Sequence, residues 1–266
     1  MYPTADEILE LLRQEGTEEK RRVLSSFFKT GKGEYGEGDV FLGVVVPKTR
    51  AIAREYNRIM RAAGVWPYSK ERYEREEGYR ELCRQDEQTV LQLLASPYHE
   101  ARLCALLVWV DRLRLKRTPL CEREYIAGLY LQHRRYINNW DLVDLSTPHL
   151  LGNFWLAAGY TDEEVMERIR PLQDSGLLWE KRIAILSTFS FTRAGRFAPL
   201  LWLARQNLCD RRDLMQKATG WMLREAGKRK VEVLLDFLQE HHAEMPRTMY
   251  RYAIERLSPA ERASIG

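Results

Sequence analysis

Apolar residues recur at intervals of three and four along most of the chain, which is the pattern of amphipathic α-helices. Strict alternation of apolar and polar residues, the pattern of a half-buried strand, is almost absent. The exception is residues 41–46 (FLGVVV), which fit either a short strand or a loop that leads into the next helix. The sequence therefore predicts an all-α protein.

The helices predicted after residue 90 fall in antiparallel pairs, whose first members start roughly 44, 37 and 33 residues apart. This spacing is typical of two-helix solenoid repeats of the HEAT or armadillo type. We expect one domain over residues 1–266, a right-handed α-solenoid of HEAT-like pairs with a concave basic face. A non-repetitive helical domain is the alternative. The predicted pairs are 97–117 with 122–136, 141–159 with 161–173, 178–191 with 195–208, and 211–227 with 230–242.

The N-terminal region is predicted to close one end of this array. Residues 1–30 carry an amphipathic pattern, with Ile8, Leu9, Leu11 and Leu12 as its apolar positions, and we expect capping helices there. Residues 31–47 begin with a glycine-rich stretch and are expected to form a loop.

The composition is that of a globular protein, because 45% of the 266 residues are hydrophobic and 30% are charged. Basic residues outnumber acidic ones by 42 to 38, and the excess falls after residue 100. Arginine supplies 32 of the 42 basic residues, and its guanidinium fork suits phosphate. The charge is compatible with a nucleic-acid partner, although an arginine-rich genome would give the same composition.

Several classes of protein are excluded. The longest uninterrupted apolar run, residues 103–110, is far shorter than the ~20 residues that cross a bilayer. The first residues lack the pattern of a signal peptide, and the four cysteines are never spaced as CxxC. We therefore expect a cytoplasmic protein with neither disulfides nor a zinc site. Nucleotide-binding and metalloprotease motifs are missing and the histidines lack ligand spacing, so we expect no cofactor and no metal.

The first of three segments with candidate chemistry is residues 138–152, NNWDLVDLSTPHLLG. On a helix, Trp140 and Asp144 would be neighbours on one face. Asp141 is expected at the helix N-cap, which is a structural position. Asp144 lies between apolar residues and beside an indole, where it is either a solvated surface acid or a functional carboxylate.

The other two segments combine cations with a second tryptophan. Residues 178–186 read LWEKRIAIL. Residues 216–230 carry cations and a tryptophan at helical spacing, so these side chains would form one stripe along a helix. Trp221 in that stripe either packs between repeats or offers a stacking surface. The recurring cations Arg102, Arg182 and Lys217 either follow a phosphate backbone or pair with acidic residues of the neighbouring repeat. The stripe consists of Lys217, Trp221, Arg224 and Lys228.

Together, NWDLVDLSTPHLLG, LWEKRIAILS and QKATGWMLREAGKR resemble the signature segments of the AlkD-type DNA alkylation repair family. The resemblance covers residues 27–224, with the segments in the same order and at similar spacing. It implies a HEAT-like-repeat DNA glycosylase that releases N3- and N7-alkylated purines from double-stranded DNA, as a monomer and without a cofactor. Some members of this family have lost the catalytic aspartate, and this sequence keeps it.

The resemblance assigns roles to individual residues. Asp144 matches the family's catalytic carboxylate, Trp140 the aromatic residue four positions earlier, and Arg182 the active-site arginine beside the DNA backbone. Trp221 matches the second aromatic wall, and Phe27 falls near a position where the family can have a tyrosine. The remaining expected DNA contacts are Lys181, Lys217 and Arg224.

Two features depart from the family pattern. Asn139 stands where a second aromatic residue can precede the tryptophan, which would change the aromatic surface of the cleft. The glycine-rich stretch 31–38 is longer than the shortest family versions.

The implied chemistry suits this residue set. A purine alkylated at N3 or N7 is cationic and leaves without being protonated, so one carboxylate can stabilise an oxocarbenium-like sugar and position water. The family recognises the lesion from the backbone side, with the base largely stacked. Two other functions remain open: a non-catalytic DNA-binding solenoid for damaged or branched DNA, and a protein-interaction scaffold. The scaffold is favoured if Arg182 and Lys217 pair with acidic residues across repeats.

Overall fold

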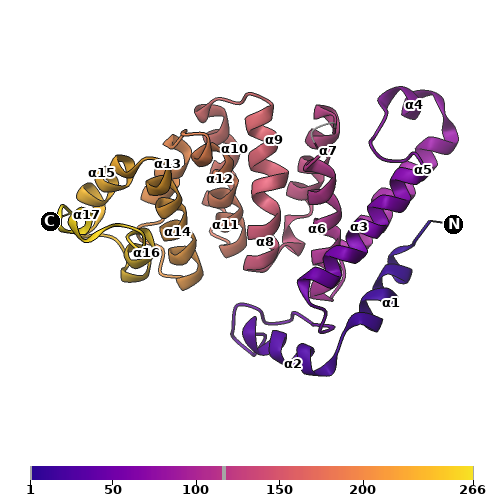
Figure 1. Ribbon diagram of the computed structural model, residues 1–266, viewed down its shortest axis with the longest axis horizontal. Coiled ribbons are helices and arrows are strands. Elements are labelled where there is room, and N and C mark those ends of the chain that lie inside the picture. The colour runs from indigo at the N-terminus through magenta and orange to yellow at the C-terminus, as the bar shows by residue number, and fades with distance from the viewer. Residues whose placement is uncertain (1, 116–117, 266) are drawn as a thin grey trace. The chain divides into compact units, whose positions relative to one another are not determined.

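The computed structural model describes residues 2–115 and 118–265, and it is built from helices joined by short loops (Figure 1). Within those two ranges, β-type pairing is limited to one isolated bridge between Val40 and Tyr98. The prediction of an all-α protein is therefore confirmed. The chain divides into two compact units, Met1–Leu142 and Val143–Gly266. The expected single domain and the right-handed superhelix with its basic concave face stay predictions.

The first unit is organised around α6, which packs against α1, α3 and α5. Nearly every residue of α6 is buried, because this helix contains the apolar run that the sequence singles out. Residues 1–30, where capping helices are expected, contain α1 and α2, and their capping role stays a prediction. The helices of this unit are α1 (Ala5–Glu15), α2 (Glu18–Phe27), α3 (Val46–Ala62), α4 (Lys70–Arg75), α5 (Glu77–Leu94), α6 (His99–Leu113), α7 (Leu120–Gln132) and the 3₁₀ turn η1 (Arg134–Tyr136).

The apolar segment before α3 is a loop, so the loop alternative for FLGVVV is the correct one. The carboxylate of Glu100, near the start of α6, accepts hydrogen bonds from the backbone N–H groups of Leu42, Gly43 and Val44, at 2.8–3.0 Å. A side chain from a helix thus takes the donors that a neighbouring strand would otherwise bind. Gly43 has a φ of 87°, and a Cβ atom there would come within 2.2 Å of the carbonyl oxygen of Thr17.

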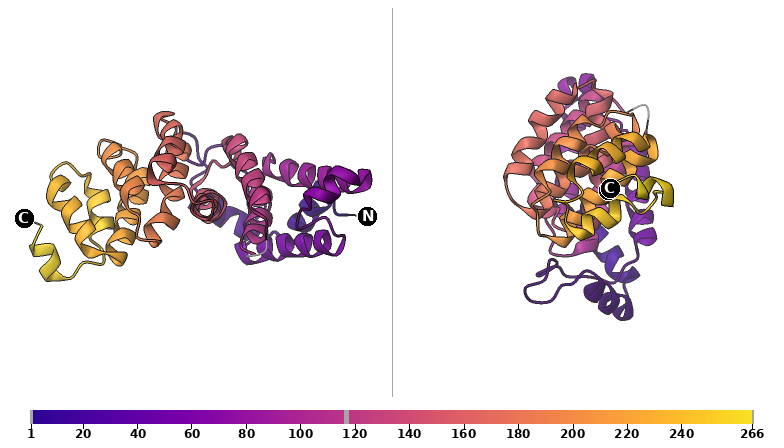
Figure 2. Two further views of the ribbon diagram at one scale, coloured as in Figure 1. Left: turned by 90° about the horizontal axis from the view of Figure 1, so that it is seen from above. Right: turned by 90° about the vertical axis from the view of Figure 1, so that its left-hand side faces the viewer.

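The second unit is a row of helices in which α10 packs on α11, α11 on α14, and α14 on α15 and α16 (Figure 1, Figure 2). Helix α8 (Trp140–Thr147) crosses the boundary between the units and continues into a π-helical turn at Pro148. The helices that follow are η2 (Pro148–Gly152), α9 (Asn153–Ala157), α10 (Asp162–Asp174), α11 (Leu178–Ser187), α12 (Phe189–Arg193), α13 (Ala198–Gln206), α14 (Asp213–Arg229), α15 (Val231–His241), α16 (Arg247–Ala253) and α17 (Pro259–Ala263).

Two glycines in the loop before α3 allow a test of the close approach between this loop and α2. Gly43 and Gly38 both have a positive φ, but a Cβ atom at Gly38 would meet no atom within 4 Å. We expect Gly38→Ala to lower the free energy of unfolding by about 1–2 kcal/mol, the cost of the left-handed backbone alone. Gly43→Ala should cost roughly 2 kcal/mol more because of the clash. Urea denaturation of both variants measures the difference, and equal losses would contradict the close approach of this loop to α2.

Candidate active site

Asp144 and Arg182 form a bidentate ion pair. The Arg182 Nε atom lies 2.8 Å from Asp144 Oδ1 and its Nη2 atom lies 2.7 Å from Oδ2. Arg182 also donates from Nη1 to the backbone carbonyl of Leu214, at 2.6 Å. The guanidinium side chain is 6% exposed, whereas the Asp144 side chain is 20% exposed. The arginine is thus fixed in the interior, and it orients a carboxylate that still faces outward.

The outward side of Asp144 lines a pocket of about 480 Å³ in the second unit. This volume falls in the range of pockets that bind small ligands. Apolar side chains and a few polar groups line it together, so a charge at its centre would be only partly hydrated. The residues around it are Asp144, Pro148, His149, Asn153, Leu156, Phe189, Ser190, Arg193, Ala194 and Trp221.

Trp221 stands in the pocket wall beside Phe189, with ring centroids 6.1 Å apart and planes inclined by 47°. Its indole Nε1 donates to Glu225, one turn later on α14, at 3.2 Å. Arg193 extends at the exposed rim, with its guanidinium carbon 5.9 Å from the centroid of Phe189. The structure therefore brings Asp144, Arg182 and Trp221 together in the second unit, and the roles expected for them stay predictions.

The other predicted cations all have acidic neighbours. Lys181 is buried, and its Nζ atom lies 2.6 Å from Asp210, so it does not present its charge to solvent as a DNA contact would. Lys217 pairs with Asp213 on its own helix, at 2.7 Å. The remaining stripe residues also pair, Arg224 with Glu255 and Lys228 with Glu225.

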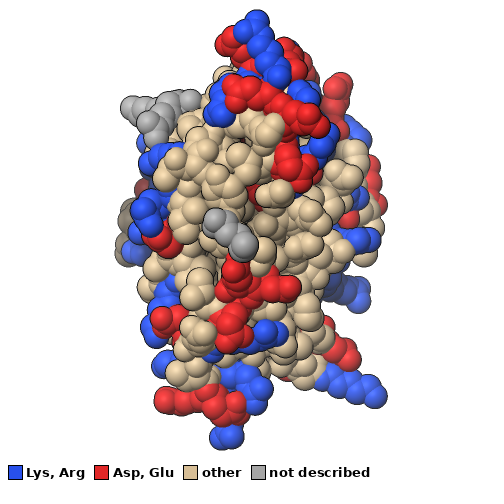
Figure 3. Space-filling model, turned by 90° about the vertical axis from the view of Figure 1, so that its right-hand side faces the viewer, with Lys and Arg blue, Asp and Glu red and all other residues tan. Residues whose placement is uncertain are grey.

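These pairings bear on the scaffold alternative. Arg182 pairs between helices, with Asp144 of α8, as the scaffold alternative expects, and Lys217 pairs with Asp213 of its own helix. Exposed pairs such as Lys217 with Asp213 are weak and exchange readily with other anions. Figure 3 shows one face of the molecule, where basic and acidic side chains are interspersed around uncharged areas.

Trp140 belongs to the first unit, where it is part of an aromatic cluster. It stacks on Phe28 with centroids 5.3 Å apart, and Phe27 meets it edge-on at 5.9 Å. Its indole Nε1 donates to the hydroxyl of Tyr35, at 3.3 Å. Phe27 is 60% exposed, so the cluster reaches the surface. Phe28 and Tyr35 carry no sequence signal beyond their nearness to Phe27, so their contacts with Trp140 could not be predicted from the sequence.

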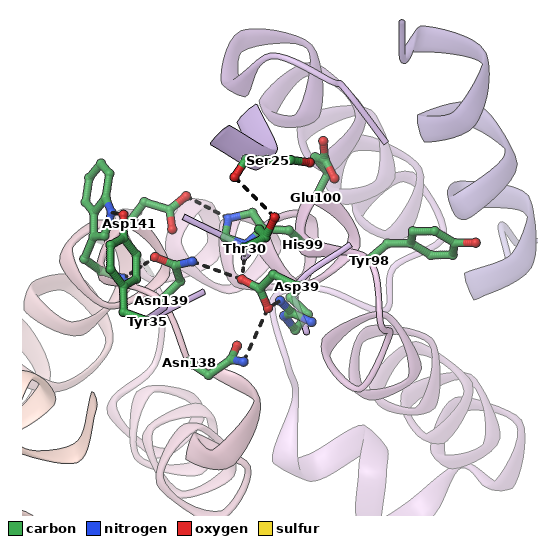
Figure 4. A network of polar contacts seen from close by, with 12 residues as sticks. Ser25, Thr30, Tyr35, Asp39, Tyr98, His99, Glu100, Asn138, Asn139 and Asp141 are labelled. Atoms are coloured by element: carbon green, nitrogen blue, oxygen red, sulfur yellow. Dashed lines mark hydrogen bonds and ion pairs between the residues drawn. The ribbon is translucent and has the colours of Figure 1, made fainter. Parts of the chain in front are cut away.

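A buried ionic network lies next to this cluster (Figure 4). His99 sits between two carboxylates, with Nδ1 3.2 Å from Asp39 and Nε2 2.9 Å from Asp141. Arg102 donates to Asp39 at 2.5 Å, and Asn139 donates to the same carboxylate at 3.0 Å. Two anions and two cations thus neutralise each other in a largely buried site.

This network corrects two expectations. Asn139 is fully buried and hydrogen-bonded to Asp39, so it does not alter the aromatic surface of any cleft. Asp141 is not the N-cap of its helix, because α8 already begins at Trp140, and its carboxylate contacts His99 instead. Both residues are polar at the start of a helix, and the sequence alone does not reveal a partner 42 or 100 positions away.

The pKa of His99 follows from its two partners. Burial alone lowers the pKa of the imidazole, but hydrogen bonds to Asp141 and Asp39 outweigh burial and raise the pKa to about 9. For Asp39, burial raises the pKa, and the contacts with His99, Arg102 and Asn139 outweigh burial, so its pKa is lowered. His99 is therefore an imidazolium at neutral pH, which lets both ring nitrogens donate.

Two negative findings apply to residues 2–115 and 118–265. No group of three or more His, Cys, Asp or Glu side chains there is arranged to hold a metal ion. None of the helices in the same ranges is long and apolar enough to span a membrane.

The fold and the pocket define an all-helical protein with an arginine-oriented carboxylate at the centre of its candidate site. A family model described as "DNA alkylation repair enzyme" matches residues 8–257, and the chain belongs to this family. In structure, it is similar to a "Predicted DNA alkylation repair enzyme from Enterococcus faecalis", with a TM-score of 0.66 and 16% identity. That match covers 92% of this chain and 98% of the other, and it supports the fold. No curated protein matches by sequence.

The charge on His99 makes stability depend on pH. Its folded pKa of about 9 lies above the ordinary value of 6.5, so its contribution is complete below pH 6.5 and is lost as the pH rises through 9. We expect the free energy of unfolding to fall by about 3 kcal/mol over this window. Urea titrations at several pH values measure the slope. His99→Gln should remove this dependence, and a wild-type profile that is flat from pH 6.5 to 9 would contradict the assignment.

Proposed function

We propose that this protein is a DNA glycosylase that hydrolyses the N-glycosidic bond of cationic N3- and N7-alkylpurines in double-stranded DNA. The observation that carries the proposal is the carboxylate of Asp144, held by Arg182 and turned toward a pocket that Trp221 also lines. Membership of the DNA alkylation repair family makes alkylated DNA the substrate class to test.

Hydrolysis of this bond requires little from the protein beyond a carboxylate held in a fixed position. An alkylated purine is already a cation, so its departure needs no acid, and the bond breaks with positive charge left on the deoxyribose. A preorganised carboxylate stabilises that developing charge and does not have to reorient as the reaction proceeds. Asp144 then orients the water that attacks the anomeric carbon. Arg182 is a positioning residue in this scheme, since both its carboxylate contacts go to Asp144.

Aromatic side chains supply the contacts with the sugar and the backbone. Trp221 and Phe189 offer ring faces in the pocket wall, and such faces bind cationic or sugar groups favourably. In the first unit, Trp140 and Phe27 pack edge to face, and the family resemblance assigns both to DNA contact. Recognition from the backbone side leaves the base stacked, so the alkyl group itself is not enclosed.

The direct test is the release of 7-methylguanine from methylated duplex DNA under single-turnover conditions. We expect Asp144→Asn to lower the rate by about 100-fold or more, because it removes the charge with little change in volume. DNA affinity should remain within about threefold, since the change removes no cation. The matched control is Asp162→Asn, which breaks the ion pair of Asp162 with Arg196 outside the pocket.

Each outcome separates the candidate functions. Loss of release in Asp144→Asn with normal release in Asp162→Asn supports the proposal. Equal release by the wild type and Asp144→Asn would overturn the role of Asp144. Binding to duplex DNA without release by the wild type would instead favour the non-catalytic DNA-binding protein, and absence of binding would favour the interaction scaffold.

Arg193 gives a second prediction, because its guanidinium stands at the exposed rim of the pocket. If it contacts a phosphate, Arg193→Gln should reduce the slope of log affinity against log salt by about one. Arg193→Lys keeps the charge and serves as the control, with a slope like that of the wild type. Fluorescence anisotropy at several salt concentrations measures both, and an unchanged slope in Arg193→Gln would contradict the contact.

A further inference from the structure

The buried network around His99 holds the chain on both sides of Trp140. On the preceding side, Asn139 donates to Asp39 at 3.0 Å and accepts the backbone N–H of Trp140 at 2.8 Å. On the following side, Asp141 binds His99 at 2.9 Å. Both neighbours of Trp140 are therefore tied to one charged centre (Figure 4).

The same centre also meets the rings that pack on Trp140. Phe28 lies 5.1 Å from the ring of His99 and 5.3 Å from that of Trp140, so it contacts both. Phe41 also stacks on His99, with ring centroids 4.5 Å apart. A cationic imidazole is attracted to these aromatic faces. The position of the Trp140 ring thus depends on His99 through the backbone and through Phe28.

We propose that His99, Asp39 and Asp141 are positioning residues that fix the Trp140 ring for base release, and this proposal rests on the proposed function. Two carboxylates on one imidazole need two N–H donors, which a neutral ring does not have. Loss of the proton turns one ring nitrogen into an acceptor that faces a carboxylate. Asp39 keeps Arg102 and Asn139 as donors, so the contact with Asp141 is the one expected to open.

The other charged groups near His99 are already engaged. Glu100, the next residue, binds backbone N–H groups of the loop before α3. Arg13 of α1 lies over the ring of Tyr98, 5.5 Å from its centroid. The pairs that α3 and α5 make with α6 involve Asp111 and Arg112, toward its opposite end. The carboxylates that touch the imidazole among the described residues are therefore Asp39 and Asp141.

The experiment reports on Trp140 directly. The full chain is labelled with 5-fluorotryptophan, and the ¹⁹F resonance of Trp140 is assigned by its absence from Trp140→Phe. The test variants are His99→Gln, which removes one of the two ring donors, and Asp141→Asn, which removes one charge. The control is Asp111→Asn. The Asp111 side chain is 15% exposed, as is that of Asp141, and it pairs with Arg50 near the other end of α6.

We expect the Trp140 resonance to shift in His99→Gln and Asp141→Asn and to stay in place in Asp111→Asn. In the wild type it should titrate with a midpoint near pH 9, which tests the proposal without any substitution. The single-turnover rate of 7-methylguanine release should fall by about 10- to 100-fold in both test variants, with DNA affinity unchanged. The rate in Asp111→Asn should match the wild type.

Other results would overturn the proposal. A Trp140 resonance that neither titrates nor moves in the test variants would show that the network only stabilises the fold. The same conclusion would follow if release fell equally in the test variants and in Asp111→Asn. If the wild type releases no purine, the proposed function fails, and the resonance alone then decides whether His99 positions Trp140.

Discussion

The bidentate contact between Arg182 and Asp144 is the interaction on which the second unit's candidate site depends. It joins three helices, because Asp144 lies on α8, Arg182 on α11, and the carbonyl that Arg182 also binds belongs to Leu214 on α14. A guanidinium this deeply buried is tolerated only with its donors satisfied. The same contacts that satisfy it leave the carboxylate with one orientation, toward the pocket. Structural stability and the proposed chemistry therefore have the same physical origin.

The first unit also contains a buried cation whose donors need partners, the imidazolium of His99. His99 is protonated because two carboxylates enclose it, and the network extends through Asn139 to the backbone of Trp140. In the first unit, the buried cation His99 orients Asp141 at the start of α8. In the second unit, the buried cation Arg182 orients Asp144, one turn later on the same helix. Buried ions of this kind cost desolvation energy, which their hydrogen-bonded partners must offset.

The sequence predicted the helices well because each carries its own periodicity and its own start and stop signals. Thr161 and Glu164 form a capping box at the start of α10, and α11 begins at Leu178 as predicted. Long-range pairing was not predictable to the same degree. Lys181 and Arg182 are adjacent, yet one meets Asp210 and the other Asp144, because successive helical positions face directions about 100° apart. Likewise, the FLGVVV segment became a loop because Glu100, a residue 57 positions from Gly43, binds its backbone.

The central claim is that Asp144 stabilises positive charge on the deoxyribose. The most direct measurement is the affinity for duplex DNA that carries a cationic pyrrolidine in place of one deoxyribose, compared with a neutral tetrahydrofuran at the same site. We expect the wild type to bind the cationic analogue at least about 100-fold more tightly and Asp144→Asn to lose this preference. Equal affinity of the wild type for the two analogues would contradict it.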